Sequence, residues 1–553
     1  MDRLVPPLSP RFIAFTLAIL ATLFIAAALA FGGASGPLWW VALVVCGALC
    51  AVGVHDLLQQ NHAILRNYPI AAHLRFIFEE IRPEMRQYFF EGEKDGAPFS
   101  RDRRAIVYQR AKKASEKRPF GTQHDVYAEG YEWVHHSMAP TAASQEDFRV
   151  LVGGPDCAQP YSASVFNISA MSFGSLSANA IRALNKGAAM GGFAHDTGEG
   201  GFSRHHAEGG GDVIREIGSG YFGARDLEGK FLPERFAQTA AHPQIKMIEV
   251  KLSQGAKPGH GGVLPAAKVS AEIAAARGVA PGVDCVSPPA HSAFATPIEL
   301  TLFIGELRRL SGGKPVGCKL CVGHPWEFLA ICKAMLETGV YPDFIVVDGK
   351  EGGTGAAPME FMDHIGMPLR DGLNFVHNAL IGVNARERIR IGASGKIITA
   401  FDIARAMALG ADWCNAARGF MFAVGCVQSH SCHTDRCPTG VATQDATRQR
   451  ALVVENKAER VLNYHGGTVR ALAEFVASAG LSHPTEFTPL HFSRRISSHE
   501  TLSLAESYPR LKPGELLAGT DDPRFRDAWK MADPGSFRPR PIGAVNLLED
   551  GRA

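Results

Sequence analysis

The sequence predicts an α/β protein, a closed (β/α)8 barrel of the TIM type with an N-terminal transmembrane helical hairpin. Short β-branched runs alternate with amphipathic helical stretches from about residue 150 to residue 445, as in parallel sheets covered by helices. Glycine-rich loops follow these runs, and a barrel gathers such loops on one face, where they build one site. Two uncharged apolar runs precede this region. We prefer the closed barrel to an open doubly wound sheet, which would disperse the loops.

The repeating units place the main elements of the barrel. The predicted strands are 165–169, 245–250, 316–320, 344–347 and 388–391, and the predicted helices are 178–186, 268–277, 326–336 and 402–409. No Gly-x-Gly-x-x-Gly motif follows the first strand, so a Rossmann dinucleotide site is not supported. The formal net charge of +2 provides no field to attract nucleic acid, and we expect no such partner.

Two apolar runs near the N-terminus, 12–31 and 38–54, are long enough to cross a membrane as helices. Arginines precede the first run and follow the second, whereas the connecting loop carries no charge. The positive-inside rule then places both termini in the cytoplasm. We predict a two-pass protein of the cell inner (plasma) membrane with a cytoplasmic catalytic domain. A secretory signal peptide and a buried helix pair of a soluble protein are the alternatives.

The chain is expected to have four regions. The hairpin occupies 1–57, and a connector over 58–150 packs on the barrel and lies near anionic headgroups, with a solvated basic face as the alternative. The barrel occupies 151–480 and includes a cysteine-rich loop over 425–444. Residues 481–553 are expected to form an irregular tail.

Three thiols, Cys426, Cys432 and Cys437, lie within that one short loop. A disulfide would leave one thiol unpaired, and cytoplasmic thiols stay reduced. Zinc could recruit His430 or His433 as a fourth ligand, although the spacing differs from that of common zinc sites. An iron–sulfur cluster suits three thiolates in a loop with proline after the last one.

The segment from Gly425 to Gln444 resembles the [3Fe–4S] loop of the glutamate synthase large subunit, and the three cysteines match the ligands of that family one for one. A series of glycine-rich loops is similar, in order, to the FMN-binding barrel of the same family. These loops are 169–175, 197–201, 254–259, 287–289 and 352–356, and Pro265 also matches. The resemblance covers about half of the chain and implies FMN and a [3Fe–4S] cluster as cofactors.

The resemblance also implies the residues of the site. Glu199 and Lys257 would be catalytic, and Ser219, Lys257 and Arg277 would bind the substrate, 2-oxoglutarate. The implied cofactor-binding residues are Ser169, Ala170, Met171, Ser172, Gly352, Gly353, Gly392, Gly395, Arg418 and Gly419. The chemistry agrees, because a dicarboxylate needs cations and a glutamate can move a proton. The alternatives without a catalytic role are that Arg277 is a solvated arginine at a helix end and that Glu199 caps a helix.

Two departures from the family pattern bear on the substrate. Val263 replaces a polar side chain expected near the oxo acid, and Phe202 and Ser203 replace an acidic pair. These changes leave the identity of the substrate open. Neither the amidotransferase domain nor the glycine-rich β-helix of the family is recognisable, so this chain is not expected to hydrolyse glutamine alone.

The resemblance therefore implies an oxidoreductase acting on CH–NH2 donors, of the EC 1.4 class. A ferredoxin-like protein or an NAD(P)H-oxidising subunit would donate electrons, which pass through the cluster and FMN to the imine of a 2-oxo acid and ammonia, giving glutamate. A separate amidotransferase subunit could supply the ammonia. The alternatives are a membrane-linked FMN and iron–sulfur oxidoreductase or amino acid dehydrogenase of another substrate, and a non-catalytic scaffold.

Overall fold

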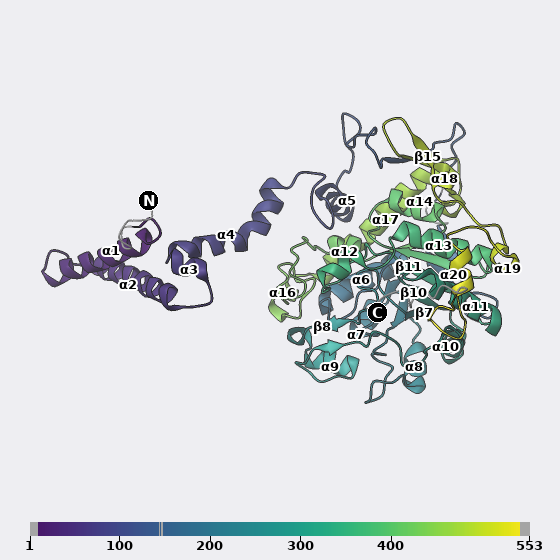
Figure 1. Cartoon of the computed structure of the whole chain (residues 1–553), viewed down its shortest axis with the longest axis horizontal. Coiled ribbons are helices and arrows are strands. Elements are labelled where there is room, and N and C mark those ends of the chain that lie inside the picture. Colours follow the sequence, from purple (N-terminus) through teal and green to yellow (C-terminus); the bar gives the residue numbers. More distant parts are fainter. Residues whose placement is uncertain (1–8, 143, 145–147, 542–553) are drawn as a thin grey trace. The chain divides into compact units, whose positions relative to one another are not determined.

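The computed structural model describes residues 9–142, 144 and 148–541 (Figure 1). Contacts within the chain divide it into two compact units, Met1–Arg101 and Asp102–Ala553. The division falls inside the connector predicted over 58–150, so the two parts of that segment belong to different units. Each unit is described by itself.

The first unit begins with two apolar helices, α1 (Ile13–Ala30) and α2 (Pro37–Leu58), which pack against each other. Both helices are long and apolar enough to cross a membrane, with mean hydropathies of 2.5 and 2.2. Gly53 leaves room for the ring of Phe15, because a Cβ at this glycine would lie 2.1 Å from Phe15 Cδ2. The prediction of two apolar N-terminal helices is thus confirmed.

Three short elements complete the first unit: α3 (Ala63–Asn67), α4 (Ala71–Met85) and a π-helical turn, η2 (Arg86–Phe90). Asp56, near the end of α2, is fully buried and ties the start of α4 to that helix. It accepts a hydrogen bond of 2.9 Å from the backbone N–H of Ile70, and its carboxylate lies 2.9 Å from His73 Nε2. These contacts therefore hold the start of α4 against the end of α2.

The second unit is built on a closed barrel of eight parallel strands, which confirms the predicted fold. The strands are β4 (Phe166–Ile168), β5 (His195–Asp196), β6 (Val213–Ile217), β7 (Ile245–Lys251), β10 (Val316–Leu320), β11 (Phe344–Asp348), β12 (Arg390–Ser394) and β13 (Trp413–Ala416). Neighbours in the barrel follow each other along the chain, and β7 pairs with β10.

Helices surround this barrel (Figure 1). The connecting helices are α6 (Ala178–Gly191), α7 (Arg204–Gly209), α8 (Pro233–Ala240), α10 (Pro297–Leu310), α11 (Pro325–Thr338), α13 (Leu369–Gly382) and α14 (Ala400–Ala408), with the short α12 (Met359–His364) ahead of α13. After β13 come α15 (Arg418–Ala423), α16 (Ala446–Arg450) and the long α17 (Val454–Ser478), which packs against α6. Another helix, α5 (Arg101–Ala111), precedes the barrel.

The predicted helix 268–277 is not one of the helices that connect consecutive strands of the barrel. The segment 268–277 begins at the end of a short 3-10 turn, η4 (Ala266–Lys268), and contains the helix α9 (Ala271–Arg277). Both elements belong to an insertion that also contains the hairpin of β8 (Val263–Leu264) and β9 (Cys285–Val286). The helix that returns the chain from β7 to β10 is instead α10. It begins with a proline and a capping box in which Thr296 and Glu299 satisfy each other's backbone N–H groups.

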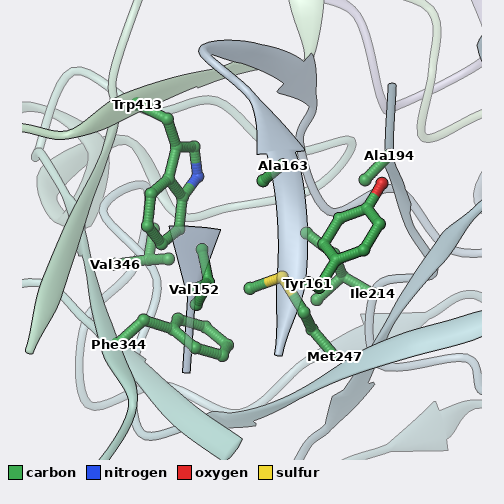
Figure 2. Packing of buried hydrophobic residues seen from close by; sticks show 9 residues of the cluster. All are labelled: Val152, Tyr161, Ala163, Ala194, Ile214, Met247, Phe344, Val346 and Trp413. Carbon is green, nitrogen blue, oxygen red and sulfur yellow. The ribbon is translucent and has the colours of Figure 1, made fainter. Parts of the chain in front are cut away.

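An apolar plug closes the amino-terminal end of the barrel strands. It is formed by the hairpin β2 (Arg149–Val152) and β3 (Tyr161–Ser164) together with residues from the strand starts. Figure 2 shows its members pointing toward one another: Val152, Tyr161, Ala163, Ala194, Ile214, Met247, Phe344, Val346 and Trp413. The glycine-rich loops follow the strands at the opposite, carboxyl-terminal end, where barrel enzymes hold their sites.

The segment after residue 480, predicted to be an irregular tail, contains short regular elements. A three-stranded sheet joins β1 (Glu132–Val134), β14 (Phe492–Arg495) and β15 (Thr501–Ser503). The turns and helices here are η5 (Pro484–Glu486), η6 (Pro489–His491), α18 (Leu504–Ser507), α19 (Glu515–Ala518) and α20 (Arg526–Met531). Leu516 and Phe525 are buried, so scattered apolar residues anchor this segment to the barrel helices. Residues 542–553 of the predicted tail lie outside the described residues.

Candidate functional site

The loop after β4, residues 169–175, is the centre of the candidate site, and Arg277 holds it in place. Arg277 Nη2 lies 3.3 Å from Ser172 Oγ and 3.2 Å from the carbonyl oxygen of Phe173. Arg277 is 2% exposed, and its guanidinium lies over the ring of Phe222, 5.0 Å from the ring centroid. Arg277 is therefore a buried anchor of the loop, which excludes the solvated helix end. A direct contact between Arg277 and substrate stays a prediction.

The loop after β5, residues 197–201, packs directly on this anchor. Gly198 has a φ of +62°, and a Cβ at this position would lie 2.7 Å from the backbone nitrogen of Ser172. Only glycine permits this backbone conformation and this approach together. The close contact brings the next residue, Glu199, to the mouth of the barrel.

Glu199 is half-buried and makes an ion pair with Lys251, which ends β7, at 2.9 Å. Partial burial alone would raise the pKa of Glu199, but the ammonium of Lys251, together with Arg277 and Lys257, lowers the pKa below its usual value. The carboxylate is thus ionised at neutral pH, where it can accept a proton or hold an ammonium ion. It pairs with Lys251 and caps no helix.

Lys257 lies in the loop after β7 and is 2% exposed. Burial lowers the pKa of its ammonium, although the charge of Glu199 opposes that shift. Among the described residues, no carboxylate lies within ion-pairing distance of Lys257 Nζ. A buried cation without a fixed anion is costly, and an anionic ligand would offset that cost.

Sequence reasoning missed a charged network inside the barrel. Lys251 also lies 3.9 Å from Glu216, and Glu216 in turn pairs with Lys319. Lys319 contacts two further carboxylates, Glu249 at 2.8 Å and Asp196 at 3.9 Å. Burial, together with the neighbouring carboxylates, raises the pKa values of Asp196 and Glu249, whereas Lys319 opposes the shift. Only Glu249 and Lys319 of this network lie in predicted strands, where they interrupt β-branched runs, whereas the segments that contain Asp196 and Glu216 were not predicted as strands.

The other predicted substrate residue, Ser219, follows β6. Its hydroxyl donates a hydrogen bond to the carbonyl oxygen of Pro288 and so joins two loops of the mouth. Val263, where the family pattern has a polar side chain, lies in β8 above the same mouth, and the adjacent Gly262 faces Glu199. Substrate contacts of Ser219 stay a prediction.

The predicted phosphate loops meet one another. Ser169 Oγ, after β4, lies 3.3 Å from Ser394 Oγ at the end of β12. Arg418, at the start of α15, donates a hydrogen bond of 2.9 Å to the carbonyl oxygen of Thr354, and its Nε would lie 3.1 Å from a Cβ at Gly353. Three loops that follow β4, β11 and β12 therefore converge with the start of α15.

The remaining predicted cofactor residues differ in their surroundings. A Cβ at Gly392 would lie 2.7 Å from Trp413 Cε2, and one at Gly419 would lie 2.5 Å from the hydroxyl of Tyr464, so both glycines have a packing reason. Gly395, with a φ of +150°, and Gly352 lie in the converging loops. Ala170 and Met171 lie in the loop after β4, where Met171 is buried. Cofactor contacts of all these residues stay predictions.

The cysteine-rich loop, residues 425–444, clasps the loop after β4. Gln444 Nε2 donates hydrogen bonds of 2.9 Å to the carbonyl oxygens of Gly174 and Leu176. Lys268 is buried between the two loops, and its ammonium donates to Ser175 O at 3.1 Å and to Ala442 O at 2.9 Å. These contacts fix the cysteine-rich loop beside the mouth of the barrel.

The three thiols of this loop are free and surrounded by protein, with Cys426 and Cys437 buried and Cys432 half-buried. Burial would raise the pKa of Cys437, but the backbone N–H groups of Ala442, Thr439 and Val441 lower it. Burial raises the pKa of Cys426 to about 11. A thiolate at Cys437 is therefore already cradled by donors, as sulfurs that ligate a cluster are.

The spacing of the thiols bears on the kind of metal site. Closed tetrahedral zinc sites bring their sulfurs to about 3.8 Å from one another. Within the described ranges, only Asp196, Glu216 and Glu249 form a group of three His, Cys, Asp or Glu ligands whose atoms all lie within 4.8 Å of one another. The three sulfurs of the cysteine-rich loop, all among the described residues, therefore do not all lie within 4.8 Å of one another.

The comparisons with known proteins agree with the resemblance. A model described as the conserved region in glutamate synthase matches residues 149–482. The glutamate synthase large subunit-like protein YerD of Bacillus subtilis is 40% identical over 479 residues, covering 79% of this chain and 91% of that protein. The archaeal glutamate synthase [NADPH] of Methanocaldococcus jannaschii is 34% identical over 316 residues, which cover 57% of this chain and 59% of that protein.

Among solved structures, a flavocytochrome b2 mutant with pyruvate bound has a TM-score of 0.40 and 12% identity, covering 75% of this chain and 85% of that one. This likeness is too distant to bear on chemistry, and the barrel assignment depends on the eight strands themselves. The match to the conserved region and the similarity to YerD together decide the family. The chain belongs to the glutamate synthase family.

Proposed function

We propose that this member of the glutamate synthase family reduces the imine of a 2-oxo acid and ammonia to an amino acid, with 2-oxoglutarate as substrate and glutamate as product. The balanced reaction converts a 2-oxo acid, ammonia, two electrons and two protons to the amino acid and water. The proposal is carried by the mouth of the barrel, where the buried Lys257, which pairs with no carboxylate of the described residues, lies near the ion pair of Glu199 and Lys251.

The residues present fit FMN. The loop after β4, Ser394 and Arg418 would hold the flavin and its phosphate, because these groups converge from separate strands. A Cβ at Gly255 would lie 1.8 Å from the carbonyl oxygen of Gly349, so the loops leave no space for side chains where they approach one another. When bound, FMN would supply the hydride, and the cluster would supply single electrons.

The residues present also fit a [3Fe–4S] cluster, which Cys426, Cys432 and Cys437 would hold. Cys432 lies against the loop after β11, since its Cβ would be 3.8 Å from a Cβ at Gly355. That loop also contains the residues proposed to meet the flavin. An electron-donor protein would therefore approach the half-buried thiol of Cys432, on the outer side of the site.

The side chains of the mouth have separate tasks in this proposal. Lys257 binds a substrate carboxylate, because a buried ammonium needs an anion. Glu199, kept ionised by Lys251, orients ammonia and accepts a proton from its nitrogen. Arg277 positions the loop after β4 through Ser172.

The test is direct. Protein purified without oxygen should contain flavin, iron and sulfide, and its reduced form should be reoxidised by 2-oxoglutarate with ammonia but by neither alone. A colourless preparation would contradict the cofactor assignment. Reoxidation by other substrates, with none by 2-oxoglutarate, would contradict the substrate.

We further propose that α1 and α2 anchor the enzyme in the cell inner membrane, with the catalytic unit in the cytoplasm. This favours a second candidate, in which the same site oxidises an amino acid and passes electrons to a membrane quinone. The apolar helices are the specific support for that candidate. Quinone reduction by purified protein supplied with amino acids, in place of 2-oxoglutarate reduction, would select it.

A further inference from the structure

An apolar stripe runs along α4 and η2 in the first unit. Its members are spaced three or four residues apart, so they share one side of the helix. The stripe consists of Leu74, Ile77, Phe78, Ile81, Met85, Tyr88 and Phe89, all of them exposed. Phe78 is 63% exposed and Phe89 is 73% exposed. Solvent exposure of so many large apolar side chains in one row marks an interaction surface.

A row of arginines borders this apolar stripe. Arg75, Arg82 and Arg86 are spaced seven and four residues apart, which places them on one edge of the helix. Arg75 is paired with Glu79 at 2.8 Å, on the side away from the stripe. Arginines that border an apolar face can bury their stems with it and direct their charges to anionic groups.

The place of α4 within its unit indicates the partner. Asp56 is two residues from the end of α2, and it binds Ile70 and His73 at the start of α4. If α2 crosses a membrane, this contact places the start of α4 at the boundary between lipid and water. An aromatic pair, Phe89 and Phe90, ends the same segment.

We propose that α4 and η2 lie in the plane of the membrane surface, with the apolar stripe at the boundary of headgroups and acyl chains and the arginine row on anionic phosphates. This proposal rests on the proposed membrane anchoring of α1 and α2. It commits to lipid, because the segment is tied to an apolar helix and because Arg82 and Arg86 border the apolar stripe and can reach anionic phosphates. A second copy of this chain and the catalytic unit are the competing occupants.

The experiment uses the full chain in vesicles of phosphatidylcholine with phosphatidylglycerol. A photoreactive benzoylphenylalanine replaces either Phe78, within the stripe, or Glu80, an exposed residue about 200° away around the helix. A third variant carries the same group at Phe24 of α1, which is 68% exposed. Adducts are identified by mass spectrometry after irradiation.

We expect the Phe78 variant to form lipid adducts severalfold more often than the Glu80 variant, and the excess to fall when phosphatidylglycerol is left out. Adducts of Phe78 to another copy or to the catalytic unit, without lipid, would overturn the proposal. Lipid adducts at Phe24 without any at Phe78 would overturn this inference alone. Absence of lipid adducts at Phe24 would overturn the membrane anchoring as well.

Discussion

The two ends of the barrel contrast in chemistry although the same strands form both. The amino-terminal end is apolar and closed by rings such as Trp413 and Phe344, whose centroids lie 5.8 Å apart (Figure 2). The carboxyl-terminal end gathers glycine loops, paired charges and the cysteine-rich loop. The difference teaches that stability and chemistry are separated along the strands, so substitutions at each end should have different consequences.

The largest effect on stability is expected at the closed end. Trp413→Ala would leave a cavity among buried rings, and the free energy of unfolding should fall by about 3–5 kcal/mol. Denaturant unfolding measures this, with Leu227→Ala as a control, since Leu227 is fully exposed. Activity per folded molecule should stay near that of the unaltered chain. A stable Trp413→Ala protein without activity would contradict the separation.

At the mouth, Lys257→Met is expected to lower activity without lowering stability, the opposite of what is expected for Trp413→Ala. This change removes a buried cation and keeps the volume, so the free energy of unfolding should stay the same or rise. The rate with 2-oxoglutarate should fall by about tenfold to a hundredfold, because a charge-assisted contact is lost. Steady-state kinetics on the folded protein checks this. Lys246→Met, at a half-buried lysine outside the mouth, is the control. Unchanged kinetics would remove Lys257 from the site.

A smaller effect should come from the glycine that joins two loops of the mouth. Gly198→Ala introduces both strain from positive φ and a collision with Ser172, whereas Gly210→Ala, at a φ of +75° with open space around it, introduces strain alone. Each strained residue costs about 1–3 kcal/mol. Thermal unfolding should therefore show a greater loss for Gly198→Ala. Equal losses would mean that the two loops do not approach as described.

The smallest effect concerns pH. Burial raises the pKa of Glu249 in the folded protein, so any stability that comes from its bound proton is present at low pH and is lost as the pH rises through the folded pKa. Glu249→Gln should therefore make stability fall less as the pH rises above the ordinary pKa of a glutamate and through the raised pKa of Glu249. Glu199, whose pKa is lowered, contributes stability that is lost as the pH falls below the ordinary pKa of a glutamate and through the lowered pKa of Glu199. A steeper fall of stability with rising pH in Glu249→Gln would contradict the raised pKa of Glu249.

The sequence was sufficient for the barrel because most of its strands are β-branched runs. It did not reveal β5, which has only two residues, or β6, where Arg215 and Glu216 interrupt the apolar pattern although both are buried. Charges that pair inside a barrel do not differ from surface charges in a linear sequence. The helix over 268–277 was assigned to the barrel because its inserted hairpin has no distinguishing composition.

For the site, motifs located the loops but not the partners of each side chain. Lys251 was missed because it ends a strand, and only the fold brings it to Glu199. Arg277 was expected at the substrate, yet its guanidinium is directed to the loop after β4, a contact between segments about a hundred residues apart in the chain. The glycines at 392 and 419 illustrate the same limit, since each also lies against a large side chain that the motif does not reveal, Trp413 and Tyr464 respectively.

The central claim is that the mouth binds a dicarboxylic oxo acid through Lys257 beside Glu199 and Lys251. Calorimetric titration of 2-oxoglutarate into the oxidised protein, compared with Lys257→Met, tests it most directly. We predict saturable binding to the unaltered protein and a dissociation constant about tenfold to a hundredfold higher in the variant. Equal affinity for the two proteins would contradict the claim.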